Sequence, residues 1–506
     1  MKTEGMTHQL LALQASNGKR NFAYFMEQGL GKSWCLLADA ERYFLAGKID
    51  ALLVIAPNGV HTNWVLREAP THLSCKNILY AWRGKLASKK KKEAFERMFA
   101  DHYVPEEKPL RVFTFNIDTV NTKEGYDAIE RVLKTYRVMI GMDESTRIKN
   151  PTAKRSKRAC ELAQLATSRR ILSGTPLPRS PSDLYMQFHF LKPGLLATKS
   201  FRAFNAEFTV LLEPGDPEMQ AILHKLGGKV YGIPQVPKKD QFGRPIYKNL
   251  SKLKMLMAPH MFRATKEEYL QDLPPKIYKF INFEMTPKQR DIYDELKSEF
   301  TYLLEYKGEK ENVQFEMIAS RTKMKQVTSG FIKVYDELVL MPPEDNPRMA
   351  AFKDYITGVL EEEPERKFIV WAMFKEEMNQ IVEFLEKEGV VCGVYNGDTP
   401  KGKREEIIDD FQKNTVENGG IQAFIGHAAA AGIGITLTAA DLSIYYSCSY
   451  DNELRKQSED RNHRIGTKSS VLYVDFIAED SIDEEIQMSL SQKSMVADHL
   501  LDGKKL

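Results

Sequence analysis

The sequence predicts an α/β protein with two doubly wound parallel-sheet lobes and helical insertions between them. Short apolar, β-rich runs alternate with helical patterns in two separate stretches of the 506-residue chain, which is typical of parallel sheets whose strands are joined by helices. Between them, residues 196–350 combine a Gly/Pro-interrupted segment (227–249) with long charged helical patterns at 286–306 and 313–336. The length also favours several domains over one.

The expected N-terminal lobe covers residues 1–195, the helical insertions and inter-lobe linker 196–350, and the C-terminal lobe with its final helix 351–506. The strand candidates of the first lobe are Ala51–Ala56, Leu110–Phe115, Val138–Met142 and Arg170–Leu172. Those of the second lobe are Lys367–Trp371, Val390–Tyr395, Gln422–Ile425, Leu442–Tyr446 and Val471–Phe476. Residues 481–501 have helical periodicity and are expected to pack on the second lobe.

The composition indicates a globular protein with a core, because 42% of the residues are hydrophobic and 28% are charged. The net charge of +3 neither requires nor excludes a nucleic-acid partner. The five cysteines are widely spaced and form no CxxC pair, so we expect a reducing compartment and neither a disulfide framework nor a zinc site. No long apolar run and no secretion signal occur, so no membrane partner is expected.

A phosphate-binding loop is predicted at EQGLGKS, residues 27–33, which lies between an apolar run and a helical pattern. Its glycines let backbone N–H groups approach a phosphate, and the following helix start favours negative charge. Lys32 would reach the β- and γ-phosphates, and the Ser33 hydroxyl would bind Mg²⁺. The strict pattern carries a further glycine where this chain has Met26, so the segment by itself is also compatible with a surface turn.

Two adjacent carboxylates, Asp143 and Glu144, end the apolar strand candidate VMIGM. In an ATPase the first would hold Mg²⁺ through water and the second would orient or activate the attacking water. Alone, the pair would more often be a helix cap and its solvated neighbour, but the upstream phosphate loop favours the ATPase interpretation. A further strand candidate leads to LSGTP, whose Ser173 and Thr175 stand where doubly wound sheets place their active sites.

The most specific segment is QSEDRNHRIG, residues 457–466, in the second lobe. Its arginines, Arg461 and Arg464, are spaced so that both can project to one side of a helix or turn. An arginine beside the γ-phosphate stabilises the charge of the transition state and accelerates hydrolysis roughly 10³–10⁵-fold. A solvated basic helix face is the usual alternative for such a pair.

In their order these segments resemble the motifs of the SWI/SNF-related group of superfamily-2 helicase-like ATPases. The resemblance extends from about residue 5 to residue 487. The segments that carry it are GLGKS (29–33), APNGVHTNW (56–64), DESTRIKN (143–150), LSGTP (172–176), MLMAPHMFRATKEEYLQDLPPK (255–276), AAAAGIGITLTAAD (428–441) and QSEDRNHRIGT (457–467). GRPIYKNLSKL (243–253) is similar to the branch of annealing helicases and replication-fork remodellers.

The resemblance implies two RecA-like lobes, ATP and Mg²⁺ as cofactors, and double-stranded DNA as partner. The nucleotide-binding residues that it implies are Gln9, Gly29, Leu30, Gly31, Lys32, Ser33 and Gln457, with Gln9 against the adenine. The catalytic residues that it implies are Lys32, Asp143, Glu144, Arg461 and Arg464, and Ser33 and Asp143 would hold the magnesium. Gln457 and the two arginines would act from across the cleft between the lobes.

The chain departs from the family pattern at three places. Ser145-Thr146 stands where the family usually has a histidine, so coupling from ATP to DNA is expected to differ in detail. Tyr450-Asp451-Asn452 replaces the usual Trp-Asn-Pro, and Thr467 replaces a glutamine. None of these positions would touch phosphate or magnesium, so hydrolysis is still expected.

The basic run Arg147–Arg158 holds six basic residues in twelve and directly follows the carboxylates, while Lys85 and Lys89–Lys92 form a second basic stretch. Such charges position a protein on phosphates without reading sequence, and we find no base-reading module. Sequence-independent binding by a monomer is therefore expected. The absence of accessory modules favours a bacterial or viral enzyme of DNA repair, recombination or fork processing, cytoplasmic there and nuclear in a eukaryote.

Two alternatives remain open at this point. A strand-separating DNA or RNA helicase would share the motifs, and a non-hydrolysing DNA-binding scaffold would share the fold. The intact set of Lys32, Asp143, Glu144 and Arg464 speaks against the scaffold. A single-lobe P-loop kinase is excluded by the second α/β region with its arginines.

Overall fold

We describe the chain from a computed structural model, which covers residues 1–58, 60–85, 88–100, 108–225, 234–241, 245–302, 311–334, 337–342, 345–431 and 435–502. Parts of the segments at 56–64, 227–249, 313–336 and 428–441 lie outside these described residues. The chain forms two compact units. The first comprises Met1–Leu211, Pro237–Gln271 and Lys493–Leu506, and the second comprises Leu212–Val236 and Asp272–Gln492.

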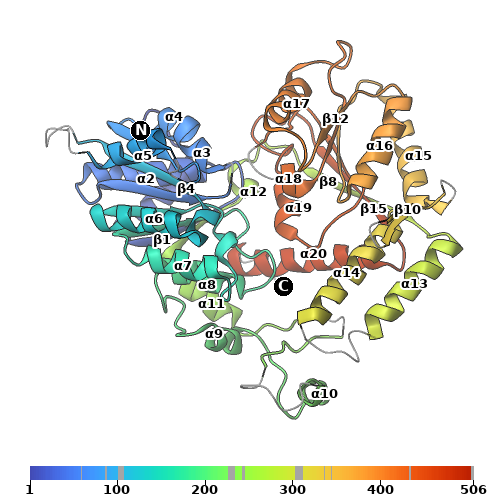
Figure 1. The fold of residues 1–506 in the computed structure, drawn as a ribbon, viewed down its shortest axis with the longest axis horizontal. Coiled ribbons are helices and arrows are strands. Elements are labelled where there is room, and N and C mark those ends of the chain that lie inside the picture. Colours follow the sequence, from blue (N-terminus) through green and yellow to red (C-terminus); the bar gives the residue numbers. More distant parts are fainter. Residues whose placement is uncertain are drawn as a thin grey trace. The chain divides into compact units, whose positions relative to one another are not determined.

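The first unit is built on a parallel sheet with the strand order β3-β4-β2-β5-β6-β1-β7 (Figure 1). Its strands are β1 (Asn21–Met26), β2 (Ala51–Ala56), β3 (Asn77–Ala81), β4 (Leu110–Asn116), β5 (Val138–Met142), β6 (Ser168–Leu172) and β7 (Met261–Ala264). In β2, Leu53 and Ile55 pack into one core cluster while Leu52 and Val54 pack into another. The sheet is thus covered on both faces, which explains why its central strands read as continuous apolar runs.

The helices of the first unit connect these strands. They are α1 (Thr7–Ser16), α2 (Lys32–Leu45), α3 (Val60–Asn63), α4 (Ala69–His72), α5 (Lys89–Glu96), α6 (Lys123–Thr135), α7 (Lys154–Ala163), α8 (Asp183–Leu191), α9 (Phe201–Phe208), α11 (Leu250–Met257) and α12 (Lys266–Tyr269). All four strands expected here are present, and β1, β3 and β7 were missed. The residues of β3 are only half-buried and β7 is a four-residue edge strand, so neither has a strong apolar signal.

The second unit also contains a parallel sheet, with the order β12-β13-β11-β14-β15-β8. Its strands are β8 (Lys276–Phe283), β11 (Phe368–Trp371), β12 (Cys392–Tyr395), β13 (Ala423–Gly426), β14 (Leu442–Tyr445) and β15 (Val471–Ala478). A separate antiparallel pair consists of β9 (Phe331–Val334) and β10 (Glu337–Leu340). The predicted fold class, two doubly wound parallel-sheet lobes, is therefore confirmed.

The helices of the second unit are α10 (Pro217–Lys225), α13 (Pro287–Tyr302), α14 (Glu311–Thr328), α15 (Pro347–Glu362), α16 (Lys375–Lys387), α17 (Lys401–Lys413), α18 (Ala428–Ala431), α19 (Asn452–Glu459) and most of α20 (Ile482–Ala497). Among the described residues of the chain, no helix combines the length and apolarity that crossing a membrane requires.

The division of the chain differs from the expected boundaries at 195 and 350. The segment 196–350 contains β7 of the first sheet and β8 of the second, and the helical pattern expected at 313–336 ends at Thr328, before β9. The edge strand β8 leaves Tyr278 and Phe280 about half exposed, so no buried apolar run marks where the second unit begins. Of the helical segment expected to pack on the second lobe, Ile482, Ile486 and Leu490 do join the core cluster of the second unit. Leu500 and Leu501 instead join a core cluster of the first unit, to which the chain from Lys493 belongs.

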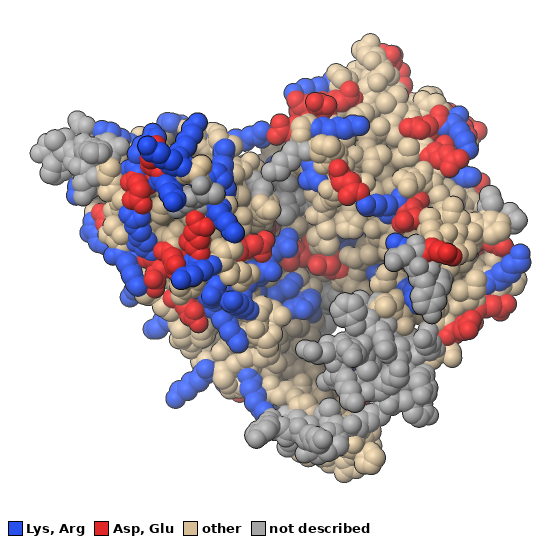
Figure 2. Space-filling view, in the orientation of Figure 1, with Lys and Arg blue, Asp and Glu red and all other residues tan. Residues whose placement is uncertain are grey.

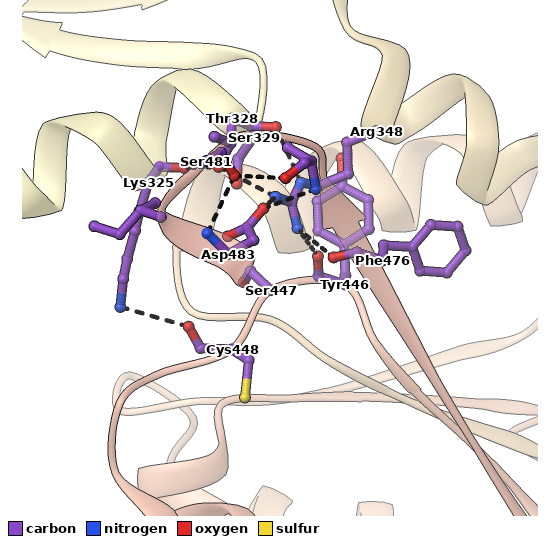
Figure 3. Close-up of polar contacts among 12 residues, drawn as sticks. Lys325, Thr328, Ser329, Arg348, Tyr446, Ser447, Cys448, Phe476, Ser481 and Asp483 are labelled. Atoms are coloured by element: carbon purple, nitrogen blue, oxygen red, sulfur yellow. Dashed lines mark hydrogen bonds and ion pairs between the residues drawn. The ribbon is translucent and has the colours of Figure 1, made fainter. Parts of the chain in front are cut away.

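The buried guanidinium of Arg348 fastens the helices of the second unit to its sheet (Figure 3). It donates to the Thr328 carbonyl at 3.0 Å, at the end of α14, and to the Phe476 carbonyl on β15 at 3.3 Å. It also bonds the Tyr446 carbonyl after β14 and the Asp483 carboxylate at the start of α20. One side chain therefore links three helices, including its own α15, to β15 and to the residue that follows β14.

Candidate active site

The phosphate-loop candidate joins β1, which ends at Met26, to α2, which begins at Lys32. Gly29 and Gly31 have φ angles of 87° and 77°, in the left-handed region that glycine adopts readily. A Cβ on Gly31 would lie 2.0 Å from Nε2 of Gln9, so a larger residue there would displace the Gln9 amide. Met26 itself is buried in the core, and the turn forms without the glycine of the strict pattern. The loop thus delivers the chain to a helix N-terminus, where backbone N–H groups lack intrahelical partners.

The Lys32 ammonium lies over the start of this loop, where it donates to the Met26 carbonyl at 3.0 Å. The LSGTP loop approaches from the end of β6: a Cβ on Gly174 would lie 3.3 Å from the Gln28 backbone nitrogen and 3.5 Å from Lys32 Nζ. Ser173 is fully buried there, and its hydroxyl accepts from the Thr175 N–H at 3.1 Å. The first and third motifs are therefore in direct contact at the carboxyl edge of the sheet.

Asp143 directly follows β5, and its N–H donates to the Ile55 carbonyl at 2.8 Å. Its carboxylate accepts from the Trp64 indole N–H at 3.2 Å and from the Glu144 N–H at 3.0 Å. Burial raises the pKa of Asp143, and the nearby Lys32 charge and the Trp64 hydrogen bond oppose that rise. The expected carboxylate and the expected phosphate-binding lysine therefore share one site.

Glu144 has a left-handed backbone, with φ 48° and ψ 61°, although it is not glycine. Burial raises the pKa of Glu68, and the nearby Ser33 hydroxyl opposes that rise. Trp64 and Glu68 were not singled out from the sequence, although Trp64 ends the APNGVHTNW segment. Their partners are distant in sequence, so no local pattern could have identified their roles.

Gln9, on α1, packs against the same loop and is buried. Its amide donates to the Leu30 carbonyl at 3.2 Å and accepts from the Met6 N–H at 2.9 Å. Nε2 of His8 lies 2.9 Å from the same Leu30 carbonyl oxygen. The N-terminal helix is thereby fixed to the phosphate loop.

Arg263, on β7, reaches this loop from the edge of the sheet. The segment 255–276 was singled out from the sequence, but no role was assigned to this side chain. Its guanidinium lies 3.6 Å from the Glu27 carboxylate and 3.4 Å from the Gly174 carbonyl oxygen. It pairs with both carboxylate oxygens of Asp502, at 2.6 and 3.2 Å. The segment after Lys493 therefore takes part in the surroundings of the phosphate loop.

The arginine segment belongs to the second unit, where α19 leads into a turn. Arg461 and Arg464 converge on the Ile435 carbonyl oxygen, at 3.3 and 3.5 Å, so both point to one side as expected. Arg464 also donates to the Thr436 hydroxyl at 2.8 Å. The Thr467 hydroxyl accepts from the Arg464 N–H at 3.1 Å, so this departure from the family pattern stabilises the turn.

Gln457 is buried on α19, where its amide nitrogen donates to Glu453 at 3.2 Å. Its amide oxygen is also buried and has no hydrogen-bond partner among the described residues. A buried acceptor of this kind is costly unless a further group donates to it.

Eight of the expected residues gather at the carboxyl edge of the first sheet: Gln9, Gly29, Leu30, Gly31, Lys32, Ser33, Asp143 and Glu144. Gln457, Arg461 and Arg464 lie in the second unit. The first group fits magnesium-bound ATP, because it combines a glycine-lined helix start and an ammonium for phosphates with hydroxyl and carboxylate oxygens, the ligands that Mg²⁺ prefers.

Two family models match the chain. The SNF2-related domain matches residues 14–338, and the helicase conserved C-terminal domain matches residues 348–466.

Several known proteins are similar to this chain. The mouse "DNA annealing helicase and endonuclease ZRANB3" is 27% identical over 78% of this chain and 33% of its own length. The Arabidopsis thaliana "CHD3-type chromatin-remodeling factor PICKLE" is 24% identical over 72% of this chain and 24% of its own length. An "Uncharacterized ATP-dependent helicase" of Mycoplasma pneumoniae is 22% identical over 94% of this chain and 40% of its own length. The chain thus spans less than half the length of each of these relatives.

Among solved structures, "Sulfolobus solfataricus SWI2/SNF2 ATPase core in complex with dsDNA" aligns with 99% of this chain and 94% of its own, at a TM-score of 0.40 and 21% identity.

Proposed function

The chain belongs to the SNF2-related family, and from this membership and the site on its first sheet we propose that it is an ATP-dependent translocase on double-stranded DNA. The observation that carries the proposal is the meeting of Lys32, Asp143 and the Gly174 loop at one sheet edge. A phosphate loop, a carboxylate placed to bind magnesium and a third loop that contacts the phosphate loop are parts that nucleotide hydrolysis requires.

Magnesium-bound ATP would supply the phosphoryl group and the cation that neutralises its charge. Lys32 and the N–H groups at the start of α2 bind the phosphates, and Gln9 lies against the adenine. Ser33 and Asp143 would hold the magnesium, and Trp64 orients Asp143 through its indole N–H. Glu144 orients the attacking water and takes its proton.

The arginines of the second unit complete the reaction in this proposal. Arg461 and Arg464 act on the γ-phosphate from the other side of the nucleotide, and Gln457 contributes its unpaired amide oxygen. An arginine there would stabilise the transition state more than the bound ATP, so its loss would slow hydrolysis more than it weakens nucleotide binding.

Basic side chains on the first unit support the DNA part of the proposal. Lysines and arginines gather on the face of this unit seen in Figure 2. On α7, Lys154 and Lys157 are exposed, whereas Arg158 is held by the Val120 and Asn121 carbonyls. The relative named an annealing helicase favours work in repair, recombination or fork processing.

The test compares ATP hydrolysis without DNA and with duplex, single-stranded, forked and four-way DNA. We expect duplex-containing DNA to raise turnover well above the DNA-free rate, and Lys32→Ala and Glu144→Gln to abolish it while a thermal melt shows an intact fold. Near-normal turnover in either variant would disprove the site. Stimulation by single strands or RNA alone, with displacement of a long paired strand, would favour the strand-separating helicase.

A further inference from the structure

Ser145, the residue that follows Glu144, is fully buried, and its hydroxyl donates to Oε1 of Gln187 on α8 at 2.7 Å. This contact lies one residue beyond the left-handed backbone of Glu144. A non-glycine residue keeps such a conformation only where its surroundings hold it. The Ser145–Gln187 bond therefore fixes the chain on the carboxyl side of Glu144.

The other end of the Gln187 amide reaches the LSGTP loop. Its nitrogen donates to the Pro176 carbonyl at 2.7 Å and to the Asp183 carbonyl at 2.8 Å. Two carbonyl acceptors can only face the amide nitrogen, so the oxygen must face Ser145 and the amide has one orientation. Gln187 is fully buried, so water cannot replace either bond freely.

The LSGTP loop is in turn held against the phosphate loop, because a Cβ on Gly174 would lie 3.3 Å from the Gln28 backbone nitrogen. Gln187 thus stands between the loop that carries Glu144 and the loop that contacts Gln28 and Lys32. A rigid amide in this place sets the distance between the Glu144 loop and the LSGTP loop.

We propose that Gln187 is a positioning residue that fixes Glu144 relative to the phosphate loop through Ser145 on one side and Pro176 on the other. The inference rests on the proposed hydrolysis of ATP. Gln187 touches neither nucleotide nor water in this role. It is needed for the placement of Glu144 in the transition state and not for the binding of ATP, which α2 and Lys32 accomplish.

The test uses Gln187→Leu, which keeps the size of the side chain but loses its bonds to Ser145, Pro176 and Asp183. Ser145→Ala removes only the hydroxyl and tests the same contact if the first variant folds poorly. We expect each to lower kcat about 10- to 100-fold with ATP affinity unchanged within about twofold, since only the transition-state interaction is lost. The double variant should be no slower than Gln187→Leu, because both changes break one connection.

The matched control is Gln164→Leu. Gln164 also uses its amide nitrogen to bond carbonyls, those of Cys160 and Phe190, but neither belongs to the active site. We expect its kcat to stay within twofold of the unmodified chain. Equal losses in Gln164→Leu and Gln187→Leu, or kcat within twofold in both Gln187→Leu and Ser145→Ala, would overturn the proposal.

Hydrogen–deuterium exchange separates this proposal from the proposed function. Gln187→Leu should speed exchange of the amides in residues 144–146 and 174–177, and Gln164→Leu should not, whether or not ATP is hydrolysed. A chain that hydrolyses no more ATP than Lys32→Ala yet shows this exchange pattern would refute the function and keep the link between the loops. Unchanged exchange in both segments would refute the link.

Discussion

Glu144 has a backbone that suits glycine, and the strain of a non-glycine residue there costs about 1–3 kcal/mol. Glu144→Gly should abolish hydrolysis, because the carboxylate is removed. It should nevertheless raise the free energy of unfolding by about 1 kcal/mol, because the relief of backbone strain exceeds the entropy cost of glycine. Urea unfolding and ATP turnover measured on one preparation test both halves. Ala197 has φ 58° and is exposed, so Ala197→Gly should stabilise similarly and keep activity. A destabilised Glu144→Gly would mean that the carboxylate itself supports the fold.

Arg464 is half-buried, and its guanidinium donates to the Thr436 hydroxyl and to the Ile435 carbonyl. With the proposed role at the transition state, Arg464→Ala should reduce turnover by a factor of hundreds or more and weaken nucleotide binding only modestly. Arg404→Ala is the control, because that guanidinium also bonds local carbonyls, at the Asn396–Thr399 turn, and should leave turnover unchanged. Lost ATP affinity with a normal rate per bound ATP would contradict the assignment.

At the scale of an element, α19 is held by buried charges. Glu459 bonds Arg455 at 2.7 Å and Lys276 of β8 at 2.9 Å, and Arg455 pairs with Asp475 of β15. Burial alone would raise the pKa of Glu459, but Lys276 and Arg455 lower it to about 2. These contacts fasten the helix that leads into the turn of Arg461 and Arg464.

The lowered pKa of Glu459 makes the free energy of unfolding depend on pH. A carboxylate whose folded pKa is below its unfolded value stabilises the fold above the unfolded pKa, and this stability is lost as the pH falls through the folded one. The unfolded pKa of Glu459 is 4.5 and the folded pKa is about 2. Glu459 therefore contributes on the order of 3 kcal/mol to the free energy of unfolding, and this contribution is lost between about pH 5 and 2. Glu459→Gln should lower the unfolding free energy at pH 7 and flatten its decline with acid, in urea titrations at several pH values. The control is Glu383→Gln, which breaks an exposed pair with Lys387 and should change both quantities far less. Parallel curves for the unmodified chain and Glu459→Gln would refute the stabilising role of Glu459.

At the scale of the whole molecule, the C-terminal segment contributes to the first unit. Leu500 is 1% exposed within its core cluster, so Leu500→Ala should cost about 2–5 kcal/mol and lower the melting temperature of the first unit. Leu45, which is 71% exposed at the end of α2, supplies the control, since Leu45→Ala should cost under about 1 kcal/mol. Calorimetry of both variants tests this, and equal shifts would show that residues after Lys493 add little to this unit.

DNA binding by both units should be governed by phosphates. If about six phosphates are neutralised, affinity should fall about 10³-fold between 50 and 200 mM salt, whatever the sequence. Lys154→Gln and Lys157→Gln should each reduce the salt slope by about one, whereas Lys413→Gln, which breaks an exposed pair with Asp409, should not. Filter binding over a salt series measures the slopes. A shallow slope with preference for one sequence would reveal a base-reading element.

The sequence alone determined the buried strands and the family, because apolar runs and motifs are local patterns. Buried parallel strands need continuous apolar runs, so Ala51–Ala56 and Val138–Met142 were predicted to the residue. The family was also predicted from motif order. What only the tertiary structure decided are contacts between distant segments: Trp64 with Asp143 across 79 positions, Ser145 with Gln187 across 42, and Arg263 with Asp502 across 239. The half-exposed β8 and the docking of residues after Lys493 belong here too. Periodicity reports which face of an element is buried, but the choice of partner is made by packing of the whole chain.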